Sequence, residues 1–300
     1  GTCFPKDISA LIKLGKDKDI SGDVGQRIKN VLLIAFGQKK MFDRPIVGIL
    51  HFAVYAGFVI INLEILEIIL DGLFGTHRIF AAPLAGFYPF IINFFEVLAL
   101  AVVVACVVFL IRRYIFNVPR LKASSHREMK GWPELDATLI LVIEIALMWA
   151  FLSMNTADSI LQSRGAEHYA DANTGFFLIS GMLEPLFSGM STTSLIVYER
   201  AAWWFHILGI LSFALYVTYS KHLHIALAFP NTYFAKLSPK GQMNNMPAVT
   251  KEVKIMLGME QPDAAPAEIG RFGAKDVQDL SWKNLMDAYS CTECGRCTSA

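Results

Sequence analysis

Long apolar runs separated by short polar segments dominate the chain. Four of these runs, at residues 46–70, 87–111, 135–154 and 201–219, stand out. Each is close to or above the roughly 20 residues that an α-helix needs to cross a hydrocarbon layer of about 30 Å. The pattern therefore predicts an all-α membrane protein, a transmembrane bundle of about four helices.

The stretch 174–198 fits this pattern less clearly, because Glu184-Pro185, Gly181 and Gly189 interrupt it. It could be a span, a re-entrant segment or a surface segment. The loops at 39–44, 112–130 and 221–240 hold twelve Lys or Arg residues, and the loops at 71–86 and 157–200 hold three. Cytoplasmic loops are the basic ones. Only four spans, with 174–198 not crossing, put all three basic loops on one side, which we expect to be the cytoplasm.

The flanking segments complete the expected organisation. From Asp23, apolar positions recur with helical spacing (Val24, Ile28, Val31, Leu32 and Ala35), which predicts a short amphipathic helix at the membrane surface. We expect a polar N-terminal segment with this helix at 1–45, a transmembrane domain at 46–228, a cytoplasmic linker at 229–279 and a further domain from 280. The hydrophobic share of 54% supports a membrane protein. The net charge of +1 gives no reason to expect a nucleic-acid partner.

The end of the chain carries the clearest chemical motif. Cys291, Cys294 and Cys297 form C-x2-C-x2-C. Structural zinc usually uses two separated pairs of ligands, and a disulfide would leave one thiol over. The spacing is that of the first three ligands of a bacterial 4Fe–4S run, whose fourth cysteine ligates another cluster. We therefore expect residues 280–300 to begin a 4Fe–4S ferredoxin-like domain that continues beyond Ala300.

Four histidines near the ends of the predicted spans suggest haem. His206 and His224 are eighteen residues apart, which is five turns or about 27 Å on a continuous helix, so they would share one face. Such a helix could ligate two stacked haems. His51 is the expected partner of His224, which His222 could replace, and His77 is preferred over His168 as the partner of His206. Alternatively, all are structural histidines at the membrane interface.

Ionisable residues inside the predicted spans need a reason, since each costs at least about 2.5–3.5 kcal/mol in hydrocarbon. Glu64, Glu67 and Asp71 would form one stripe on the first span, and Glu96 and Glu144 lie in the second and third. They are candidates for a proton path to a quinone. Hydrogen bonding between helices is the alternative.

Several segments also carry a family resemblance: Arg27-Ile-Lys-Asn-Val-Leu32, Arg44-Pro45 with His51, Ser220-Lys-His-Leu-His224, and the closing cysteine motif. The chain resembles membrane iron–sulfur oxidoreductases that fuse a domain like the nitrate reductase gamma subunit to one like the catalytic subunit of heterodisulfide reductase. Asn62–Glu67 and Asp71–Arg78 look like the form found in Bacteroidetes-type bacteria.

This resemblance implies b-type haem, two 4Fe–4S clusters, menaquinone as the lipid partner and the bacterial inner membrane as the location. Electron-transfer flavoprotein or a subunit with CCG domains would be the cytoplasmic partner. The gamma-subunit relatives place their two partner histidines closer together than His51 and His77 are. The expected function is electron transfer between a cytoplasmic donor and menaquinone through haem b. A non-catalytic anchor for an iron–sulfur partner, a thiol/disulfide oxidoreductase subunit and an ion carrier are the alternatives.

Overall fold

The computed structural model describes residues 23–116, 118–121, 130–170, 172, 174–239, 247–261 and 276–294. Within these ranges every regular element is a helix, which confirms the all-α prediction. The chain divides into two compact units. One comprises Gly1–Phe36 and Ala226–Ser290, and the other comprises Gly37–Ile225 and Cys291–Ala300.

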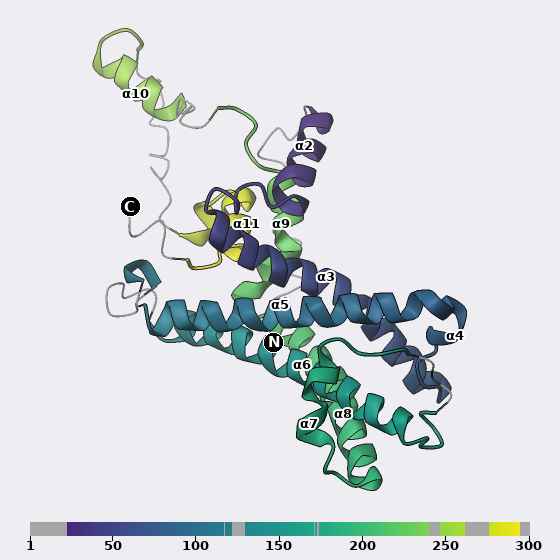
Figure 1. Cartoon of the computed structure of the whole chain (residues 1–300). Helices are drawn as coiled ribbons and strands as arrows, with labels where there is room; N and C mark the ends of the chain where they lie inside the picture. Colours follow the sequence, from purple (N-terminus) through teal and green to yellow (C-terminus); the bar gives the residue numbers. More distant parts are fainter. Residues whose placement is uncertain are drawn as a thin grey trace. The chain divides into compact units, whose positions relative to one another are not determined.

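Four helices of the larger unit are long and apolar enough to cross a membrane, as predicted (Figure 1). They are α3 (Pro45–Phe74), α5 (Tyr88–Tyr114), α6 (Trp132–Ser163) and α8 (Thr192–Val217). Short turns of helix at Ala81–Leu84 (α4) and Ala85–Phe87 precede α5 and extend it to a 34-residue segment. α3, α5 and α6 each have proline in their first turn, where its missing N–H costs nothing.

The stretch 174–198 does not form a separate span, as expected. It contains a 3₁₀ turn at Ser180–Leu183 and the short helix α7 at Glu184–Phe187. Ser191 then caps α8 by accepting a hydrogen bond from the Ser194 N–H. The fourth span therefore begins before the predicted residue 201. Glu199 is nearly fully buried and accepts a hydrogen bond from the Tyr169 hydroxyl, so this acid does not interrupt the helix.

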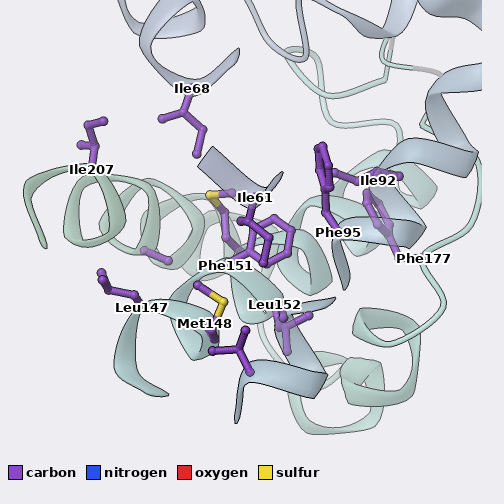
Figure 2. Close-up of a cluster of buried hydrophobic side chains, with 14 of the residues drawn as sticks. Ile61, Ile68, Ile92, Phe95, Leu147, Met148, Phe151, Leu152, Phe177 and Ile207 are labelled. Atoms are coloured by element: carbon purple, nitrogen blue, oxygen red, sulfur yellow. The ribbon is translucent and has the colours of Figure 1, made fainter. Parts of the chain in front are cut away.

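The spans pack in the order α3, α5, α6, α8, since α5 contacts both α3 and α6, and α6 contacts α8. Figure 2 shows side chains of their shared core, including Ile61 of α3, Ile92 and Phe95 of α5, and Phe151 of α6. The helices approach closely at Gly57, where an added Cβ would lie 2.4 Å from a methyl carbon of Val102.

The helix that carries His206 ends earlier than the sequence suggested. α8 stops at Val217, a 3₁₀ turn covers Lys221–Leu223, and His224 is the first residue of α9 (His224–Tyr233). His206 and His224 therefore lie on different helices. The prediction that five continuous turns place them on one helical face was wrong.

The smaller unit contains the predicted amphipathic helix, α2 (Val24–Asn30), which continues as a π-helix over Val31–Phe36. The Arg27 guanidinium is buried and donates to the carbonyl oxygens of Tyr233 and Ala235 at 2.9 and 3.3 Å. Apolar side chains of this helix are exposed instead (Val24, Ile28, Leu32, Leu33 and Phe36). This arrangement suits a helix at a membrane surface, which stays a prediction. The same unit holds α10 (Pro247–Met256) and α11 (Trp282–Tyr289).

Candidate functional site

Three histidines gather at the end of the bundle where α3 begins. His51 lies in the second turn of α3, His222 in the 3₁₀ turn, and His224 at the start of α9. The ring of His222 lies 5.6 Å from that of His224 and 5.4 Å from that of Phe213. His51 is within electrostatic reach of both other histidines. The structure thus brings together His51, His224 and the alternative ligand His222.

The ring nitrogens of this cluster suit metal binding. The Nδ1 atom of His224 lies 2.9 Å from the carbonyl oxygen of Lys221, so Nδ1 carries the proton and Nε2 has the free lone pair. Nδ1 of His51 is buried and has no hydrogen-bond partner. Burial lowers the pKa of His222 to about 4, helped by the nearby His224, and burial also lowers the pKa of His224. Both rings are therefore neutral near pH 7, which is the ligand form.

A buried carboxylate, Asp136 of α6, holds the turn that positions these histidines. It accepts hydrogen bonds from the Ser220 hydroxyl at 2.7 Å, from the Lys221 N–H at 3.0 Å and from the Tyr216 hydroxyl. These hydrogen bonds stabilise the turn that follows α8 and leads to His224. Sequence reasoning missed Asp136. The available signal was an acid close to the start of a predicted span.

The cysteine loop is described as far as Cys294, and Cys291 and Cys294 are both exposed. Cys297 lies outside the described residues. The N–H of Glu293 lies 3.4 Å from the sulfur of Cys291, and the Glu293 carboxylate lies 2.9 Å from Nζ of Lys221. Across the described part of the chain no three His, Cys, Asp or Glu side chains are grouped closely enough to hold a metal.

The other predicted histidine pair is not in contact. Nε2 of His77 lies 3.0 Å from Oδ1 of Asp158, and its ring lies 5.4 Å from that of His168. His206 is buried in α8, and its Nδ1 lies 3.1 Å from the carbonyl oxygen of Leu147. His206 lines a cavity of about 50 Å³ together with Glu144, whereas His77 lines different cavities. The structure therefore places His77 next to His168, the less favoured candidate, and away from His206.

Arg78 lies at the centre of a buried polar network. Sequence reasoning had counted this residue only as a charge in a loop. Its guanidinium contacts Asp158 at 3.0 Å, Glu64 at 3.3 Å and Asn155 at 2.6 Å. Burial disfavours its charge, but Tyr88, Asp158 and Glu64 outweigh burial and keep the pKa of Arg78 well above its ordinary value. A permanent positive charge thus lies between α3 and α6.

The predicted proton-path acids fall into two groups. Glu67 accepts from the Phe80 N–H and the Tyr88 hydroxyl, and Asp71 accepts from the N–H groups of Arg78 and Ile79. Glu96 accepts from Asn155 and from the Ile179 N–H. These three acids stabilise loops and helix contacts. In contrast, one oxygen of Glu64 is buried without a partner, and Glu144 lines the cavity beside His206. A role in proton transfer stays a prediction for all five.

A cavity of about 230 Å³ opens beside this network. Its polar lining comes from the loop after α3 and from α8, and α8 also supplies two indole rings (His77, Arg78, Glu199, Arg200, Trp203 and Trp204). It therefore combines hydrogen-bonding groups with flat aromatic surfaces at one end of the spans.

Comparison with known proteins gives two relatives. The chain is 28% identical over 291 residues to a protein of Bacillus subtilis (strain 168) named probable iron-sulfur-binding oxidoreductase FadF, covering 97% of this chain and 36% of the relative. It is 25% identical over 279 residues to EtfAB:quinone oxidoreductase of Syntrophomonas wolfei, covering 91% of this chain and 34% of the relative.

The chain is thus similar to two proteins named as oxidoreductases, one of them as iron–sulfur-binding. It spans about a third of the length of these two curated relatives. No family model and no solved structure matches it. The similarity to the first relative supports the iron–sulfur interpretation of the cysteine motif.

Proposed function

We propose that this chain carries electrons between a cytoplasmic iron–sulfur donor and menaquinone in the bacterial inner membrane. Cys291, Cys294 and Cys297 would ligate a 4Fe–4S cluster, and His51 and His224 would ligate a b-type haem. The observation that carries the proposal is the group of histidines with available nitrogens at one end of a four-helix bundle, in the same unit as the cysteine loop.

The residues at this end fit haem b in their donor chemistry. His224 offers Nε2 while its Nδ1 is bonded to a carbonyl, which is the arrangement typical of metal-ligating histidines. Nε and Nη2 of Arg113 are also buried without a partner. Arg113 ends α5, and α3 and α5 form an antiparallel hairpin, so Arg113 belongs to the same end of the bundle as His51. Its guanidinium could pair with a haem propionate. Haem would supply one-electron redox chemistry at this position.

A second haem at His77 and His206 remains the sequence-based part of the proposal. Nε2 of His206 is free to ligate because Nδ1 faces the Leu147 carbonyl oxygen. Nε2 of His77, however, faces Asp158 and would have to leave it. The geometry therefore favours the pair of His51 and His224 as the first haem site to test.

We assign the quinone ring to the cavity of about 230 Å³ beside Arg78. Trp203 and Trp204 offer flat surfaces for a naphthoquinone, and the Arg200 guanidinium offers a donor for one of its carbonyl oxygens. Two-electron chemistry at a quinone also moves two protons, and Glu64, with its unpartnered buried oxygen, lies beside Arg78. The similarity to the EtfAB:quinone oxidoreductase of Syntrophomonas wolfei supports both a quinone and electron-transfer flavoprotein as partners.

The direct test is the spectrum of the purified protein in detergent, reduced with dithionite. The parent should show the α band of a b-type haem, and His51→Ala and His224→Ala should each weaken it. His126→Ala is the matched control, since His126 lies outside the predicted spans and in none of the proposed haem pairs, and it should keep the band. A parent protein without haem, or a full band in both variants, would leave a non-catalytic anchor as the function. Quinol-driven reduction of the haem would then test the quinone site separately.

A further inference from the structure

Lys221 joins the two parts of the proposed electron path. Its carbonyl oxygen accepts the hydrogen bond from Nδ1 of His224 at 2.9 Å. Its Nζ lies 2.9 Å from a carboxylate oxygen of Glu293 in the cysteine loop. All of these residues belong to the larger unit. A single residue therefore contacts both a predicted haem ligand and the loop that carries the predicted cluster ligands.

Contacts with α6 order Lys221 independently of Glu293. Its N–H donates to Asp136 at 3.0 Å and its Nζ donates to the carbonyl oxygen of Pro133 at 2.6 Å. Its side chain is only 10% exposed, whereas that of Glu293 is 40% exposed. An ordinary surface ion pair is weak, partly because two long side chains lose their freedom. Here the lysine is already ordered by α6, so the ion pair orders only the loop.

Glu293 is placed to transmit this contact to the cysteines. Its φ of 48° lies in the left-handed region, which is uncommon for a residue other than glycine. In that conformation its N–H points toward the sulfur of Cys291 at 3.4 Å while its side chain reaches Lys221. Successive contacts thus connect Cys291 to Glu293, Glu293 to Lys221, and Lys221 to His224.

We propose that Lys221 is a positioning residue that docks the cysteine loop, through Glu293, against the histidine turn and so sets the electron-transfer distance from cluster to haem. The effect on electron transfer rests on the proposed function. The docking of the cysteine loop does not rest on it, because the docking depends only on contacts within this chain. Electron transfer falls steeply with distance, so a loop released from Lys221 would still bind its cluster but would deliver electrons slowly.

The first experiment measures the docking without any cofactor. A water-soluble carbodiimide activates a carboxylate, and a lysine amine in contact with it then forms an amide bond while the carbodiimide leaves as a urea. We expect mass spectrometry of the treated full chain to find Lys221 linked to Glu293. The pair of Lys283 and Asp287, 2.5 Å apart, serves as the internal positive control. Glu293→Gln should abolish only the first link. Formation of the control link without the Lys221–Glu293 link would overturn the docking.

The second experiment measures its redox consequence. Glu293→Lys should keep the haem α band and the cluster EPR signal, but should slow reduction of the haem by the pre-reduced cluster severalfold, since electron tunnelling falls steeply with distance. It should also weaken the magnetic broadening that the haem causes in the cluster signal. Lys283→Met, which removes a paired lysine elsewhere in the chain, should transfer electrons at the parental rate.

The outcomes separate this inference from the function on which it rests. A parent protein that lacks haem or cluster contradicts the proposed function and leaves the cross-linking result standing. A Glu293→Lys protein that holds both groups and transfers electrons at the parental rate with unchanged EPR broadening contradicts the positioning role. Recovery of the parental rate in Glu293→Asp, which keeps the charge, would support that role.

Discussion

Removing the carboxylate of Asp136 should destabilise the protein and disrupt its histidine turn. In Asp136→Ala the Ser220 hydroxyl, the Tyr216 hydroxyl and the Lys221 N–H all lose their acceptor. A buried donor left unpaired costs about 1–3 kcal/mol. Hydroxyl groups can rotate to another acceptor but a backbone N–H cannot, so the total loss should be about 3 kcal/mol. For a protein of this size that corresponds to a fall in melting temperature of roughly 5 °C.

The assay is thermal unfolding in detergent, followed by differential scanning fluorimetry and by the haem absorbance of each variant. Asp136→Asn keeps one carbonyl oxygen but turns an amide N–H₂ toward some of the donors, so its loss should be intermediate. Glu134→Gln is the control, because Glu134 lies two residues away on the same helix and its side chain takes no part in the turn. The reasoning would be refuted if Asp136→Ala melted like the parent and retained the same haem absorbance.

Three further predictions follow from the packing and the site. Arg78→Met should lower the free energy of unfolding by about 3–5 kcal/mol, because it leaves Asp158 and Glu64 buried without their cation, and a parental melting temperature would contradict this. Gly57→Ala should cost about 1–3 kcal/mol through its clash with Val102, and a double-mutant cycle with Val102→Ala should recover most of the loss. If it does not, the helices are not in contact at this point. Cys294→Ser should lower the iron and acid-labile sulfide of the purified protein by one 4Fe–4S cluster, with an unchanged iron content as the contrary result.

The spans could be predicted from the sequence because their apolar length is a local property. Their ends could not, because distant partners decide them. Asn155 and Asp158 would end α6 if they faced lipid, but Arg78 pairs with both and the helix continues to Ser163. In the same way Glu199 lies inside α8, because Tyr169 contacts it.

The candidate site was predicted in part. The sequence selected His51 and His224, and the structure brings them into one cluster. The sequence-based prediction was wrong for the geometry of His206 and His224, because helical spacing assumes an unbroken helix. Asp136 stabilises a turn after Val217, although it lies 80 residues away from Tyr216 in the chain. Arg78 was counted as a loop charge for the same reason: its partners on α3 and α6 become neighbours only in the folded bundle.

The Arg78 network also has a consequence for how the protein is made. α3 and α5 leave the ribosome before α6, so their hairpin enters the membrane with Arg78 facing the acids of α3 alone. Asp158 and Asn155 reach Arg78 only when the third long helix inserts. The first hairpin is therefore an unfinished insertion intermediate whose charge is compensated late.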